Sequence, residues 1–148
     1  TGRKEIIELL RQRSRPYLFS NSLPPAVVNA GIRMFDMMAE THELQDKLHS
    51  NTDYFMAGMK LAGFDIKPSK SAICAVMLYD AKLSQDFAAK LLEEGIYVIG
   101  FYYPVVPQGQ ARIRVQLSAA HDMEHLEKAI KAFTKIGKEL GVISSKRP

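Results

Sequence analysis

The stretch "IYVIGFYYPVVPQGQARIRVQLS", residues 96–118, carries the pattern that decides the fold. Residues 96–103 form an apolar and aromatic run that is typical of a strand, and residues 111–118 alternate strictly between apolar and polar side chains. The segment between them, 104–110, is a short loop with two prolines and one glycine. Two strands joined by so short a loop are expected to pair antiparallel as a hairpin.

The alternation in 111–118 separates the two faces of that strand. The apolar face carries Ile113, Val115 and Leu117, and the polar face carries Arg112, Arg114, Gln116 and Ser118. If other protein covers the polar face, its two arginines need anions, and a guanidinium suits a carboxylate bidentately. The alternative is a solvent-facing surface, which is the commoner case for a small antiparallel sheet.

Three further elements surround this hairpin. "AICAVMLY", residues 72–79, is short and continuously apolar, which predicts a strand buried on both faces. Ser84 is expected to cap a helix that runs to Glu94 and stops at Gly95. A last helix is predicted over 122–140. These elements predict a three-stranded sheet with helices covering one face.

The first half of the chain reads as a helical arm. Apolar residues recur with the helical period from Pro24 to Ala62, a span too long for one typical helix, so we expect a bend or restart near Thr41. Gly63 is the expected end of the arm, and the boundary with the α/β unit is placed in 63–71. The predicted fold class is therefore α/β (an α+β small domain), a helical arm plus a three-stranded sheet covered by helices.

A short connecting segment, residues 17–22, precedes this helical arm. A helix over 3–13 is expected to end because Pro16 disfavours helix in the residue before it, which leaves 17–22 non-helical. Ser20 and Asn21 then stand just before the mouth of the long helix, where unpaired backbone N–H groups bind anions. The alternative is that the next residue, Ser22, merely caps the helix and its neighbours are turn residues.

Composition bounds the class of protein. The 148 residues are 47% hydrophobic and 24% charged, which is typical of one globular domain. No apolar run approaches the roughly 20 residues that a membrane helix needs, so no membrane partner is expected. The one cysteine, Cys74, has no intrachain partner and lies in an apolar stretch, which indicates a reducing compartment and a structural role.

The net charge of +4 is concentrated at the two ends of the chain. Basic side chains crowd 3–15 and return at 146–147, and they are either solvated ends or part of a site for an anion such as a phosphate. Nucleic acid is not an expected partner, because no basic strand with interleaved aromatics and no known binding module is present.

"HDMEH", residues 121–125, matches an inverted zinc-peptidase pattern. Asp122 is the natural N-cap of the last helix, so His121 falls before the helix and the two histidines lose the one-turn spacing that a zinc site needs. No third ligand follows. The sequence therefore predicts no metal site, and it offers no nucleophile–base–acid set.

Three motifs together resemble a known family. "RQRSRPYLFSNSLPP", "EEGIYVIGFYYPVVPQGQARIRVQLSAAH" and "AFTKIGKELGV" are similar to the C-terminal portion of the α-oxoamine synthases, which are fold-type I pyridoxal-phosphate (PLP) enzymes. The resemblance covers almost the whole chain except "SSKRP". It implies the C-terminal part of the fold-type I PLP-dependent transferase fold. Residues 1–35 would be the end of the large PLP domain and the start of the interdomain helix, 36–143 the small domain, and 144–148 a disordered tail.

The resemblance also implies roles for particular residues. Ser20 and Asn21 would reach the PLP phosphate of the neighbouring subunit of a homodimer, and Arg114 would hold the substrate carboxylate. The family's Schiff-base lysine, which Lys4 does not match, would lie upstream of Thr1. The chain is thus expected to be a piece of a longer protein, to contain no catalytic residue and to be inactive alone.

The motifs are most similar to the branch of this family that condenses glycine with acetyl-CoA to 2-amino-3-oxobutyrate and CoA. That reaction belongs to threonine degradation, with threonine dehydrogenase as pathway neighbour, in the cytoplasm or, in a eukaryote, the mitochondrial matrix. Two alternatives remain open: an α-oxoamine synthase with a different acyl donor or amino acid, and a free-standing, non-catalytic dimerisation or regulatory module.

Overall fold

The computed structural model describes residues 1–19 and 22–144. The chain divides into two compact units, one over residues 1–42 and one that begins at Glu43. The boundary that the sequence placed in 63–71 is therefore wrong, because the helix before it belongs to the second unit. In the part of the chain that the structure describes, no helix has both the length and the apolar character needed to cross a membrane.

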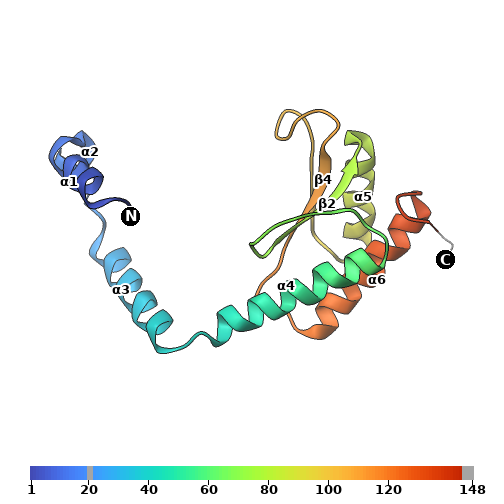
Figure 1. Cartoon of the computed structure of the whole chain (residues 1–148), viewed down its shortest axis with the longest axis horizontal. Coiled ribbons are helices and arrows are strands. Elements are labelled where there is room, and N and C mark those ends of the chain that lie inside the picture. Colours follow the sequence, from blue (N-terminus) through green and yellow to red (C-terminus); the bar gives the residue numbers. More distant parts are fainter. Residues whose placement is uncertain (20–21, 145–148) are drawn as a thin grey trace. The chain divides into compact units, whose positions relative to one another are not determined.

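The first unit contains the helices α1 (Lys4–Arg13), α2 (Arg15–Phe19) and α3 (Pro25–Glu40) (Figure 1). The predicted first helix is confirmed. The prediction that residues 17–22 are non-helical is wrong for 17–19, which belong to α2. Pro16 explains both observations. It lies in the first turn of α2, where its missing N–H costs no helical hydrogen bond, and it cannot continue α1.

The first unit has no core of its own. None of its described residues is buried, and large apolar side chains are open to solvent, with Phe19 76% and Phe35 66% exposed. Short helices in water depend on packing of an apolar face for most of their stability. The apolar faces of this unit therefore find no partner within the unit itself.

The second unit begins with α4 (Glu43–Leu61). The restart predicted near Thr41 is confirmed, because α3 ends at Glu40 and α4 starts three residues later. The predicted stop at Gly63 is also confirmed. This glycine has a φ of +101°, and the Phe64 amide after it donates to the Met59 carbonyl at 3.1 Å, which closes the end of the helix.

The sheet of this unit has four strands, not the predicted three. They are β1 (Ile66–Lys67), β2 (Ile73–Tyr79), β3 (Ile99–Phe101) and β4 (Ala111–Gln116), in the order β1-β2-β4-β3, and every pair is antiparallel. The predicted hairpin is confirmed as the β3–β4 pair, with Ile99 opposite Arg114. β3 is shorter than the predicted strand over 96–103, and β1 has too few residues to show a periodic pattern.

The helices α4, α5 (Ala81–Glu93) and α6 (Met123–Glu139) pack on one face of this sheet (Figure 1). That face carries the side chains of Cys74, Val76 and Ile113, all fully buried. Four phenylalanines from the helices and the loop after α4 meet there, with ring centres 5.5–6.2 Å apart: Phe55, Phe64, Phe87 and Phe133. The opposite face carries the polar side chains of β4 together with Ile99 and Phe101 of β3.

The helix caps correct one prediction and confirm another. Asp80, not Ser84, caps α5, because its Oδ1 accepts from the Leu83 amide at 2.7 Å. Ser84 lies inside the helix, fully buried, and its hydroxyl donates to the Ala81 carbonyl at 2.8 Å. Asp122 is the N-cap of α6 as predicted. The tail 145–148 lies outside the described residues.

Candidate functional site

Arg114 stands on β4 at the open face of the sheet. Its side chain is exposed, and its guanidinium carbon lies 5.7 Å from the centre of the Phe101 ring. Within the described residues it makes no hydrogen bond and no ion pair. The structure therefore presents a full positive charge with all five N–H donors available, which is the arrangement that receives a carboxylate.

Arg112, two residues earlier on the same face, is bound differently. Its Nε donates to the Gln110 carbonyl at 3.0 Å and a terminal nitrogen donates to Gln110 Oε1 at 3.3 Å. These contacts turn the guanidinium back along its own strand. Of the two arginines that the sequence placed together, Arg114 is thus the one whose donors are unused in the described part of the chain.

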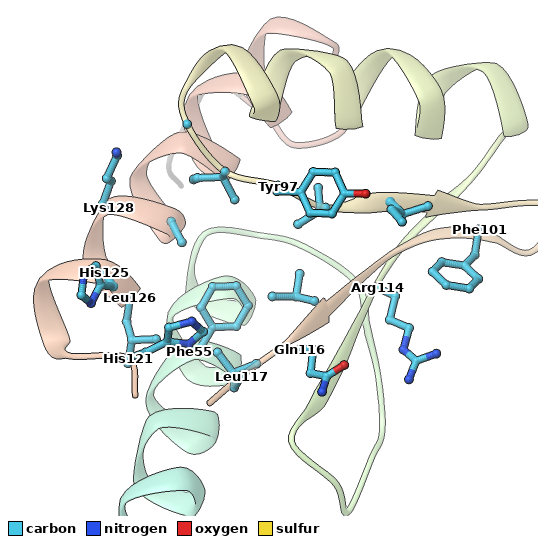
Figure 2. A pocket seen from close by; sticks show the side chains of 16 residues that line it. Phe55, Tyr97, Phe101, Arg114, Gln116, Leu117, His121, His125, Leu126 and Lys128 are labelled. Carbon is cyan, nitrogen blue, oxygen red and sulfur yellow. The ribbon is translucent and has the colours of Figure 1, made fainter. Parts of the chain in front are cut away.

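Arg114 contributes to the wall of a cavity of about 610 Å³ (Figure 2). The cavity lies between the β3–β4 pair, the segment 95–98 and the first turns of α6, and its apolar lining includes Phe55, Leu117 and Leu126. The ionisable side chains among the described lining residues are Tyr97, Arg114, His121, His125 and Lys128, and none of that lining is acidic. A cavity of this size with a basic lining favours an anionic group over a cation.

The two histidines of this lining have structural hydrogen bonds. His121 precedes α6, as predicted, and its Nδ1 accepts from the Ser118 amide at 3.2 Å. His125 Nδ1 accepts from the Asp122 amide at 3.1 Å, which helps to cap the helix. Each ring thus uses its Nδ1 lone pair on backbone, and no three His, Cys, Asp or Glu side chains of the described chain form a metal-binding group.

The other predicted site residues, Ser20 and Asn21, lie outside the described residues. Their neighbours do not: α2 ends at Phe19 and α3 begins at Pro25. The phosphate contact expected for this pair therefore stays a prediction.

Sequence reasoning missed Phe101 as a neighbour of Arg114. Phe101 was part of a predicted strand, but its position beside Arg114 depends on the register of the hairpin. The observed register pairs Phe101 with Arg112 and Ile99 with Arg114, so Phe101 and Arg114 are diagonal neighbours on one face. An irregular loop leaves that register open, because only tight two-residue turns specify it from sequence.

Comparison with known proteins places this geometry in a family. A family model described as aminotransferase class I and II matches residues 1–133, which includes both α3 and Arg114. The chain belongs to this family.

Curated relatives show which named enzymes the chain is similar to. The chain is 56% identical over 143 residues to 2-amino-3-ketobutyrate coenzyme A ligase of Escherichia coli, covering 97% of this chain and 36% of that protein. It is 46% identical to the mitochondrial enzyme of the same name from Homo sapiens, covering 97% and 34%. The chain thus spans about a third of the length of these relatives.

Two differently named proteins are similar to the chain as well. The identity is 47% over 142 residues to 8-amino-7-oxononanoate synthase of Thermosipho melanesiensis, covering 96% of this chain and 36% of that protein. A solved serine palmitoyltransferase from S. paucimobilis, described with bound PLP and myriocin, is 33% identical with a TM-score of 0.83, covering 92% of this chain and 35% of that one. These likenesses confirm the predicted fold class and the resemblance to α-oxoamine synthases.

Proposed function

We propose that the protein carrying this chain is a PLP-dependent acyltransferase that condenses glycine with acetyl-CoA to 2-amino-3-oxobutyrate and CoA. The observation that carries the proposal is the 56% identity to the E. coli 2-amino-3-ketobutyrate coenzyme A ligase over nearly the whole chain. The exposed Arg114, with no anion among its described neighbours, supplies a group that such a reaction needs.

Among the described residues, Arg114 is compatible with the carboxylate of an amino-acid substrate, whereas the residues expected to hold the cofactor lie outside the described part of the chain. PLP, when bound, supplies an electron sink that allows the α-carbon of an amino acid to lose a proton. The residues of this chain that would hold the cofactor's phosphate are Ser20 and Asn21, offered to the neighbouring subunit of a homodimer. The guanidinium of Arg114, whose donors are unused, fits the substrate's carboxylate. The described lining of the adjacent cavity contains no acidic side chain that would compete with the substrate for this guanidinium.

Arg114 would bind and orient the amino acid. A bidentate pair between its guanidinium and the carboxylate fixes both the position and the plane of that group. Holding the substrate in one orientation contributes to the rate by lowering the entropy that remains to be lost. Arg112 is less available for the carboxylate, because two of its nitrogens already donate to Gln110.

The proposal also covers the domain organisation and the cellular location of the full-length protein. Residues 1–35 would end the large PLP domain and 36–143 would form the small domain. The lack of any buried residue in the described part of the first unit, residues 1–42, supports the placement of the start of the chain in a larger domain, because those apolar helices need cover from other protein. Threonine dehydrogenase would be the pathway neighbour. The protein would work in the cytoplasm or, in a eukaryote, in the mitochondrial matrix, in keeping with the name of the human relative.

The test uses the full-length protein that carries this segment, or the E. coli relative with its matching segment replaced by this chain. Arg114→Ala should raise the KM for glycine by a factor that corresponds to about 2–5 kcal/mol, as for other broken charge pairs. Arg112→Ala is the matched control, because its charge and strand are the same but its guanidinium is already bound. Near-normal glycine saturation in Arg114→Ala would refute the role.

A sister activity is the second candidate, because 8-amino-7-oxononanoate synthase matches the chain as well as the human 2-amino-3-ketobutyrate ligase does. A panel of amino acids that includes alanine and serine, crossed with acyl-CoAs of increasing chain length, separates the two. Preference for glycine and acetyl-CoA supports the first proposal. Preference for any other pair supports the second.

A free-standing, non-catalytic module is a weaker alternative. It requires residues 1–148 to fold, dimerise and bind a small effector without PLP. The exposed apolar side chains of the first unit argue against it, since a free domain rarely leaves such faces open.

A further inference from the structure

The register of the hairpin sets Phe101 beside Arg114. β3 and β4 pair Ile99 with Arg114 and Phe101 with Arg112, so the four side chains share the open face of the sheet. Phe101 is the diagonal neighbour of Arg114, a separation that long and aromatic side chains bridge. The guanidinium carbon stands 5.7 Å from the ring centre, within the range of a cation–π contact (Figure 2).

This contact has a consequence that an ion pair would not have. A cation–π contact restrains the guanidinium against the face of the ring without an oxygen acceptor, so the N–H donors stay unused. Arg112, by contrast, uses two of its nitrogens as donors to Gln110. Among the described neighbours of Arg114, the Phe101 ring is the one group with a specific interaction, and it restrains an otherwise long and mobile side chain.

The ring itself is held by close packing of its strand. Gly100, next to Phe101, lies against Ser84 of α5, where even a methyl group would stand 2.8 Å from the Ser84 carbonyl oxygen. β3 thus packs closely against the helices on one face of the sheet. The half-buried Phe101 side chain extends from the opposite face. A pinned strand makes the ring a fixed surface for the arginine.

We propose that Phe101 is a positioning residue, whose ring face holds the Arg114 guanidinium in the orientation that receives the carboxylate of the amino-acid substrate. The inference rests on the carboxylate-binding role of Arg114 in the proposed function. It adds a residue that does not touch the substrate and acts through the arginine.

The experiment compares Phe101→Leu with Phe101→Tyr in the full-length PLP-loaded protein. Leucine keeps apolar bulk and removes the ring, so the KM for glycine should rise about 3- to 30-fold, the range expected for loss of one cation–π contact. The turnover number at saturating glycine and the KM for acetyl-CoA should change little, because the loss is one of substrate binding. Phe101→Tyr keeps the ring face and should restore the glycine KM to within about 2-fold of the wild type.

Binding provides a readout that does not depend on turnover. Titrating glycine while following the cofactor's absorbance gives its dissociation constant, which should rise with Phe101→Leu as the KM does. Methylamine, which lacks the carboxylate, should bind Phe101→Leu and the wild type equally. A general disturbance of the fold would weaken both ligands, and that outcome overturns the proposal.

The double variant separates this inference from the proposed function. Phe101→Leu should have almost no effect on glycine binding in an Arg114→Ala background, because the residue it positions is gone. If Arg114→Ala alone leaves glycine binding unchanged, the carboxylate site itself is wrong. If Arg114→Ala weakens binding but Phe101→Leu has no effect, or has its full effect in both backgrounds, the positioning role is wrong and the function stands. If Phe101→Leu does not fold, Phe101→Met takes its place with the same expected results.

Discussion

Gly100 on β3 and Ser84 on α5 approach so closely that a Cβ on the glycine would lie 2.8 Å from the serine carbonyl oxygen and 3.0 Å from its hydroxyl. Backbone of a helix cannot move aside as a flexible side chain can. The contact therefore fixes the distance between β3 and α5. It also fixes the strand that carries Phe101, the neighbour of Arg114.

Gly100→Ala is expected to destabilise the second unit by about 1–3 kcal/mol, the usual cost of forcing a methyl group into packed backbone. Chemical denaturation followed by circular dichroism measures the change. Gly31→Ala is the matched control, because nothing lies within 4 Å of the added methyl group there. Equal midpoints for Gly100→Ala and the wild type would show that α5 and β3 are not packed as described.

Cys74 is expected to be chemically inert in the folded chain. Burial raises the pKa of its thiol to about 11, so at pH 8 only on the order of one molecule in a thousand carries the reactive thiolate. Iodoacetamide should therefore modify the cysteine slowly in buffer and rapidly in denaturing urea. Modification at equal rates in both would contradict the burial.

The same raised pKa has a consequence for stability. Because the folded thiol holds its proton more tightly than the unfolded one, its contribution is complete below the ordinary pKa of 9.0 and is lost as the pH rises through about 11. The free energy of unfolding of the wild type should fall over this window more steeply than that of Cys74→Ala. Parallel curves for the two proteins would count against the shift.

Lys47 on α4 and Asp122 at the start of α6 form an ion pair of 2.8 Å that joins the two helices. The hydrogen bond and charge of Lys47 lower the pKa of Asp122 below its ordinary value of 3.8. The pair therefore stabilises the fold at neutral pH, and its contribution is lost as the pH falls through the lowered pKa. Lys47→Met should be less stable than the wild type at pH 7 and equal to it once Asp122 is protonated.

The control for that experiment is Lys82→Met. Its ion pair with Asp86 spans 3.8 Å on the exposed side of one helix and joins no two elements. It should change stability less than Lys47→Met does at pH 7. If the free energies of unfolding of Lys47→Met and the wild type still differ by the same amount at pH 2, the lysine stabilises the fold through packing of its aliphatic stem.

Removing residues 1–42 is expected to leave the unfolding midpoint of the remaining chain unchanged. No described residue of that unit is buried, whereas the core residues all belong to the second unit. A chain of residues 43–148 should therefore lose helical circular dichroism signal but keep its cooperative urea transition. It should also bind less of an apolar dye than the full chain. A lower midpoint for the shorter chain would mean that the first unit contributes to the core.

Local chemistry was enough to predict much of this fold. The alternation in 111–118 predicted which side chains of β4 are buried, because successive residues of a strand face opposite sides. Glycines at 63 and 95 predicted two helix ends, and both have the positive φ that an L side chain disfavours. The anion-binding character of Arg114 followed from its residue type and face.

Two of the errors come from competition between equivalent local signals, and a third comes from the absence of any local signal. Asp80 and Ser84 are both good N-caps, and the burial of Ser84 against β3 decided between them. β1 is a two-residue strand that exists because β2 offers it an edge, so no pattern in its own residues marks it. Pro16 was correctly predicted to end one helix, but the same residue also suits the first turn of the next.

The sequence alone determined that a helical arm leads into a small antiparallel sheet with two arginines on one face, because periodicity is a property of neighbours along the chain. Only the tertiary structure decided which of the two arginines keeps its donors unused. Arg112 finds Gln110 two residues away, whereas Arg114 meets the Phe101 ring from another strand. Residues so distant in sequence become neighbours through strand register, and register depends on how the whole sheet packs against its helices.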